Sequence, residues 1–174
     1  MRILVAVASR HGATAEMAEW IGATLREVLA GSVDPPTVDV RTVADVPDVD
    51  GYDAVVVGSA VYMGQWLDDA RRFIGQHADA LAARPVWLFS SGPVGDPPMP
   101  AESPETTSAM VARIAPRGHR FFAGRVEPAE LGRMERMALR VVKAPAGDYR
   151  DPDAVRAWAA EIAAALLACA RARV

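Results

Sequence analysis

The sequence has very few of the side chains on which several common kinds of chemistry depend. Cys169 is its only cysteine and Lys143 is its only lysine. A single cysteine excludes a disulfide within the chain, which is typical of a reducing compartment. Cys169 falls in an alanine-rich helical pattern, so we interpret it as a small apolar side chain; a reactive thiol is the alternative.

Long apolar runs and a strong net charge are also missing. No stretch of about 20 apolar residues occurs, and the richest stretch, 157–172, contains Glu161 and Arg171. The N-terminal residues show no charged region with a cleavage site, so no signal peptide is predicted. A net charge of −3 gives no reason to expect a nucleic-acid partner. These features predict a cytoplasmic protein.

Several motifs for catalysis and cofactor binding are absent as well. The chain has no G-x-G-x-x-G, no Walker A motif and no G-x-S-x-G, and its three histidines lack metal-ligand spacing. His77 lies on an apolar stripe and is interpreted as a half-buried structural residue. A phosphoacceptor receiver domain needs acidic residues after its first strand, here the apolar run 3–8, and an aspartate at the end of its third strand, here 53–58. Here those positions hold Ala8-Ser9 and Gly58-Ser59, which excludes that class.

The residues that are present predict one ordered domain over 1–174, because 51% are hydrophobic and 24% charged. Short runs rich in branched apolar residues predict five strands, at 3–8, 37–42, 53–58, 85–90 and 120–123. Periodic apolar residues predict helices after Thr14, over 67–81, over 103–115, over 127–143 and from Pro152 onward.

This order of strands and helices predicts an α/β fold, with one doubly wound parallel sheet and helices on both faces. The run 37–42 alternates apolar and polar residues, which favours an edge strand, whereas the first and third runs are apolar throughout. The expected strand order is therefore 2-1-3-4-5. In such sheets ligands bind beyond the carboxyl ends of the strands, at the switch point between strands one and three.

Three polar loops that contain glycine are expected to meet at that point. In the first, 9–14, a strand is followed by Ser9, Gly12 and Thr14 and then by a helix N-terminus, which favours an anion site. The alternative is a plain turn in which serine or threonine caps the helix. The second, 58–66, carries Tyr62 and Trp66, which we expect to cover a flat aromatic ring; ordinary packing is the alternative. The third loop is 91–98.

These loops carry a resemblance to a known family. The run Ser9-Arg10-His11-Gly12-Ala13-Thr14 resembles the phosphate loop of flavodoxins, which has Ser or Thr at the first and last positions and Gly at the fourth. The run 58–66 resembles the second flavin loop of the subgroup that includes the menaquinone-dependent protoporphyrinogen oxidases. The resemblance covers nearly the whole chain and implies non-covalently bound FMN.

By this resemblance, the phosphate of FMN is expected to contact Ser9, Arg10, His11, Gly12, Ala13 and Thr14. The isoalloxazine is expected to contact Ser59, Ala60, Val61, Tyr62, Met63, Gly64, Trp66, Ser90, Ser91, Gly92 and Gly95. Two residues depart from the pattern. His11 replaces a hydroxyl residue of flavodoxins, and Gln65 replaces a histidine expected in the oxidases. FMN binding is therefore implied, but activity toward a porphyrinogen does not follow.

Three functions agree with this resemblance. The first is an FMN oxidoreductase that acts on a quinone or another small organic acceptor, with no catalytic acid or base assignable. The second is an electron-transfer flavodoxin that docks to redox proteins. The third is a flavodoxin-like scaffold that no longer binds FMN. The modest net charge and the abundance of arginine favour the enzyme.

The predicted helix 127–143 combines apolar residues with a basic face. Arg133, Arg136, Arg140 and Lys143 add positive charge to it. Such a helix can lie on an anionic membrane, where lipid quinones are found. The alternative is a helix packed on the domain or at a homodimer interface, since methionine and arginine are also enriched at protein interfaces.

Overall fold

A computed structural model describes residues 1–32, 34–62, 64–92, 109–127 and 146–171. Its main sheet contains five parallel strands in the order β2-β1-β3-β5-β6. The strands are β1 Arg2–Ala8, β2 Thr37–Thr42, β3 Ala54–Tyr62, β5 Val86–Ser91 and β6 Gly118–Phe122. Counted along this sheet, the order is the predicted 2-1-3-4-5, and β2 is an edge strand as expected.

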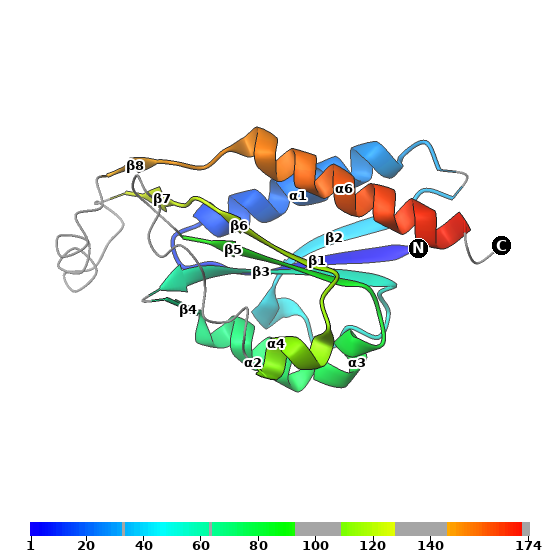
Figure 1. The fold of residues 1–174 in the computed structure, drawn as a ribbon, viewed down its shortest axis with the longest axis horizontal. Helices are drawn as coiled ribbons and strands as arrows, with labels where there is room; N and C mark the ends of the chain where they lie inside the picture. Colours follow the sequence, from blue (N-terminus) through cyan, green and yellow to red (C-terminus); the bar gives the residue numbers. More distant parts are fainter. Residues whose placement is uncertain (33, 63, 93–108, 128–145, 172–174) are drawn as a thin grey trace.

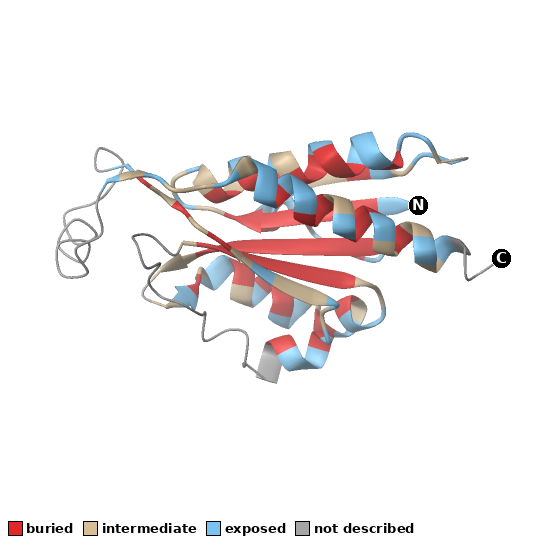
Figure 2. Cartoon of the chain, turned by 45° about the horizontal axis from the view of Figure 1, so that its top comes forward, coloured by how far each residue is buried: buried red, intermediate tan, exposed pale blue. Residues whose placement is uncertain are grey.

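Helices cover both faces of the sheet (Figure 1). One face carries α1 Ala13–Leu29 and α6 Pro152–Arg171. The other carries α2 Asp68–Gln76, α3 Ala78–Ala82, α4 Ala109–Ile114 and the short 3-10 turn η1 Val43–Asp45. The central strands β1 and β5 and most of β3 are buried between the two layers (Figure 2), as their continuous apolar runs predict.

The last helix begins as its sequence predicts. Oδ1 of Asp151 accepts hydrogen bonds from the backbone N–H groups of Asp153 and Ala154, each at 3.0 Å. Asp151 therefore caps α6, and Pro152 occupies the first helical position, where a missing N–H costs nothing. The apolar face of α6 is buried in the core: Val155, Trp158, Ala159, Ile162 and Leu166.

Two predictions about the middle of the chain are wrong in detail. The loop predicted at 58–66 is largely extended, because β3 continues to Tyr62 and pairs there with the antiparallel strand β4 Gln65–Trp66. Gly64, with φ of 77°, permits the tight turn between them. The helix predicted over 67–81 is two helices, because the backbone of His77 leaves the helical region. His77 is half-buried, as predicted, and its ring centroid lies 4.8 Å from that of Phe73.

Other predicted segments are only partly within the described residues. The helix predicted over 103–115 is observed as α4, and residues 103–108 lie outside the described ranges. The predicted helix 127–143 lies outside them from residue 128 onward. A second, two-stranded sheet, β7 Arg125–Val126 with β8 Gly147–Asp148, flanks that stretch. Within the described ranges, no helix combines the length and apolar character needed to cross a membrane.

Candidate functional site

The carboxyl ends of β1, β3 and β5 lie side by side. Ser59 of β3 is in register with Ala8 of β1 on one side and with Ser90 of β5 on the other. β1 continues into α1, on the face of the sheet opposite to α2, which follows β3 and β4 (Figure 1). The three predicted loops therefore begin at the carboxyl ends of neighbouring strands, at the switch point of the sheet.

The first of these loops leaves the N-terminus of α1 open. Gly12 is the N-cap residue, with φ of 80°, and makes no side-chain cap. The first hydrogen bond of the helix runs from the Glu16 N–H to the Gly12 carbonyl, at 2.9 Å. The alternative in which serine or threonine caps this helix is thus not what the structure shows. The first N–H groups of a helix lack intrahelical acceptors, so this end suits an anion.

The hydroxyl groups of the same loop are buried. Oγ of Ser9 is shielded from solvent and has no hydrogen-bond partner among the described residues. Thr14, the second residue of α1, is 3% exposed. A buried hydroxyl without a partner is unfavourable by about 1–3 kcal/mol. A ligand that brings acceptor oxygens to this loop would remove that penalty.

The second predicted segment approaches the first through Tyr62. The guanidinium carbon of Arg10 lies 5.4 Å from the centroid of the Tyr62 ring, within the range of a cation–π contact. The ring of His11 is tilted against the same tyrosine, with centroids 6.2 Å apart. Tyr62 is half-buried. Arg10, His11 and Tyr62 are therefore brought together at the end of β3.

Trp66 is placed differently from the expectation that it covers a flat ligand. It is 2% exposed, and its indole packs in the core on the α2 side of the sheet. Its Nε1–H donates to Oγ of Ser90 at 2.8 Å. The structure thus gives Trp66 a packing role, in line with the alternative interpretation, and leaves Tyr62 as the aromatic residue of this segment near the first loop.

The third predicted segment joins the second through close packing. Cα of Gly92 approaches β3 so closely that an added Cβ would lie 3.0 Å from the carbonyl oxygen of Val61. Ser59, Ser90 and Ser91 are all buried. The Ser59 hydroxyl donates to the Ala60 carbonyl and accepts from the Leu67 N–H, so its role is structural. Met63 and Gly95 lie outside the described residues.

A histidine that was not predicted from the sequence as a site residue lies in this region. Nε2 of His119, on β6, lies 2.8 Å from Oγ of Ser90, which also accepts from Trp66. The imidazole stacks on Phe121 with ring centroids 4.5 Å apart. Burial lowers the pKa of His119 to about 4, so the imidazole is neutral at pH 7 and its Nε2 can accept the Ser90 hydroxyl proton.

We expect His119 to make stability depend on pH. Its pKa is lower in the folded protein than in the unfolded chain, so the unfolded chain binds more protons between about pH 6.5 and pH 4. The free energy of unfolding should therefore fall as pH falls through this range, by about 2 kcal/mol after allowance for partial exposure. Urea unfolding of the wild type and of His119→Gln, at pH 7 and pH 4.5, should show a smaller pH difference in the variant. Equal differences in both proteins would contradict this.

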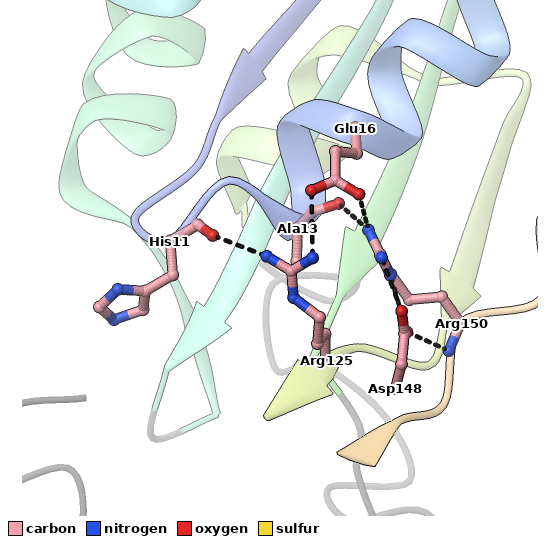
Figure 3. Close-up of polar contacts among 6 residues, drawn as sticks. All are labelled: His11, Ala13, Glu16, Arg125, Asp148 and Arg150. Carbon is pink, nitrogen blue, oxygen red and sulfur yellow. Dashed lines mark hydrogen bonds and ion pairs between the residues drawn. The ribbon is translucent and has the colours of Figure 1, made fainter. Parts of the chain in front are cut away.

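A second group of residues that was not predicted from the sequence surrounds the start of α1 (Figure 3). Arg125 of β7 pairs with Oε1 of Glu16 at 3.2 Å, and Arg150, just after β8, pairs with Oε2 at 2.7 Å. Arg150 also pairs with Asp148 at 2.7 Å. Hydrogen bonds to Arg150 lower the pKa values of both carboxyl groups. These partners are more than 100 residues from Glu16 in sequence, so no local pattern could have indicated them.

Comparison with known proteins agrees with this fold. The flavodoxin domain family matches residues 4–153. Protoporphyrinogen IX dehydrogenase [quinone] of Escherichia coli strain K12 is 26% identical over 108 residues, which span 62% of this chain but only 57% of that protein.

Solved structures with the same fold include a flavodoxin from the domain Archaea, with a TM-score of 0.53 and 19% identity over 82% of this chain and 97% of that one. The rubredoxin oxygen:oxidoreductase from Desulfovibrio gigas matches with a TM-score of 0.64 and 14% identity, over 96% of this chain and 36% of that one.

Proposed function

The chain belongs to the flavodoxin domain family, and from this premise we propose that it binds FMN at the carboxyl ends of β1, β3 and β5. The observation that carries the proposal is the first loop. Oγ of Ser9 is buried with no partner among the described residues, beside a helix N-terminus whose cap residue, Gly12, has no side chain. A phosphate monoester brings the acceptor oxygens and the negative charge that such a loop favours.

The residues near the switch point fit the two ends of FMN. The loop from Ser9 to Thr14 would hold the phosphate through backbone N–H groups and hydroxyls. The half-buried Tyr62 would lie near the flat ring system, and the close packing of Gly92 on β3 would fix the adjoining backbone. When bound, FMN supplies reversible electron transfer, and the protein supplies binding and orientation.

We further propose that the chain is an oxidoreductase whose acceptor is a quinone or a similar small organic molecule. The Escherichia coli relative is named as a quinone-linked dehydrogenase, and the net charge of this chain, −3, is modest. Gln65, at the position where the porphyrinogen-oxidising relatives are expected to carry histidine, is exposed in β4. For this reason protoporphyrinogen itself is not part of the proposal.

The cofactor is tested first by the absorption spectrum of the purified protein. Bands of an oxidised flavin, with release of FMN rather than FAD on heating, are expected. A colourless protein that fails to take up added FMN would contradict the proposal and favour a scaffold that has lost the cofactor.

The acceptor is tested by stopped-flow oxidation of the reduced protein. We expect menadione to reoxidise the bound flavin faster than it reoxidises free FMNH2, because the protein would orient the acceptor against the ring. An electron carrier would behave differently. Reoxidation by menadione no faster than that of free FMNH2, together with rapid transfer to a redox protein, would favour an electron-transfer flavodoxin.

A further inference from the structure

Two arginines contact the backbone of the loop from Ser9 to Thr14. Arg125 lies in β7, and Arg150 lies just after β8. Nη2 of Arg125 donates to the His11 carbonyl at 3.5 Å, and Nη1 of Arg150 donates to the Ala13 carbonyl at 3.3 Å. Both arginines thus contact the backbone of this loop or of its junction with α1, as Figure 3 shows. Neither lies within the loop that the family resemblance identifies.

The same two arginines neutralise a carboxylate that lies near the proposed phosphate site. Glu16 lies in the first turn of α1, so its carboxylate stands close to the place where the helix N-terminus would attract an anion. Each of its oxygens is paired, Oε1 with Arg125 and Oε2 with Arg150. Without these partners, the carboxylate would repel a bound phosphate.

The side chain of Arg150 is fixed in this position by burial and by several contacts. Its side chain is 6% exposed, and its Nε and Nη2 atoms both bond to Asp148. Its guanidinium carbon also lies 5.0 Å from the ring centroid of Trp20 in α1, within cation–π range. Because four hydrogen bonds hold its guanidinium to Ala13, Glu16 and Asp148, Arg150 would act on a ligand through the loop and through Glu16 rather than by direct contact.

We propose that Arg125 and Arg150 are positioning residues that make the Ser9–Thr14 loop selective for a phosphate monoester, so that FMN is preferred over riboflavin. This inference rests on the proposed function. The arginines fix the loop backbone at His11 and Ala13 and neutralise the nearby acid, and both effects concern the phosphate end of the ligand only. Their loss should therefore weaken FMN binding and leave riboflavin binding nearly unchanged.

The test is a pair of titrations, with FMN and with riboflavin, on the wild type, Arg125→Met and Arg150→Met. Each variant is expected to raise the Kd for FMN about tenfold, equivalent to about 1.4 kcal/mol, and the Kd for riboflavin less than about twofold. Arg120→Met is the matched control, because Arg120 is also ion-paired, with Glu161 at 3.1 Å, but on the edge strand β6. It should leave both Kd values unchanged.

A charge-matched rescue separates the electrostatic role from simple loss of packing. Glu16→Gln added to Arg150→Met removes the carboxylate that Arg150 no longer neutralises, and it should restore most of the FMN affinity. Equal losses for FMN and riboflavin, or no loss for either, would overturn the inference while the proposed function stands. A wild type that binds neither ligand would overturn the proposed function and this inference with it.

Discussion

We expect Gly58→Ala to destabilise the protein by about 3 kcal/mol or more, equivalent to roughly 6–12 °C in Tm. Gly58 lies in β3 opposite Phe89 of β5, and the phenyl ring occupies the space that a Cβ of residue 58 would need. A Cβ added there would lie 2.0 Å from Cζ of Phe89. The ring is confined by Phe122 and Trp158, whose centroids lie 6.3 and 6.2 Å away, so it has little room to move. Urea and thermal unfolding measure the loss.

Two further variants identify the cause of that loss. Gly31→Ala is the control, since a Cβ there would have nothing within 4 Å, and Tm should change little. Phe89→Leu removes the outer ring atoms, so the double variant Gly58→Ala, Phe89→Leu should be clearly more stable than the two single effects predict by addition. If Gly58→Ala unfolds like the wild type, the close packing of β3 against β5 is not as described.

The parts of the molecule that follow from local sequence were predictable. The apolar runs of β1 and β3 require burial on both faces, and the alternation in β2 requires an edge, so the strand order follows. Glycine is the residue that adopts positive φ at little cost, and Gly12 in the first predicted loop has a φ of 80°. Each of these features depends on residues that are close together in the chain.

The parts that depend on distant contacts were not predictable. An aromatic residue in a polar loop was expected to face a ligand, but the fold buries Trp66 and pairs its indole with Ser90, 24 residues away. His119 joins the same hydroxyl from another strand. Arg125 and Arg150 reach Glu16 across 109 and 134 residues. No periodicity or motif carries such pairings, because the tertiary fold alone creates them.

The largest effect on ligand binding is expected from a single charge in the first turn of α1. We expect Thr14→Asp to raise the Kd for FMN about 100-fold relative to Thr14→Asn, equivalent to about 2.7 kcal/mol. Asp and Asn have the same shape, so the comparison removes the cost of replacing a threonine that is 3% exposed. What remains is the repulsion between a carboxylate and a phosphate at the same helix N-terminus.

Two measurements on the same pair of variants distinguish lost binding from lost folding. Without FMN, Thr14→Asp should be no less stable than Thr14→Asn, because a carboxylate at a helix N-terminus interacts favourably with the helix dipole. Riboflavin, which has no phosphate, should bind both variants equally. Thr14→Asp should thus bind FMN more weakly than Thr14→Asn without being less stable. General unfolding cannot produce this combination. If both variants bind FMN with the same Kd, the phosphate does not lie at the N-terminus of α1.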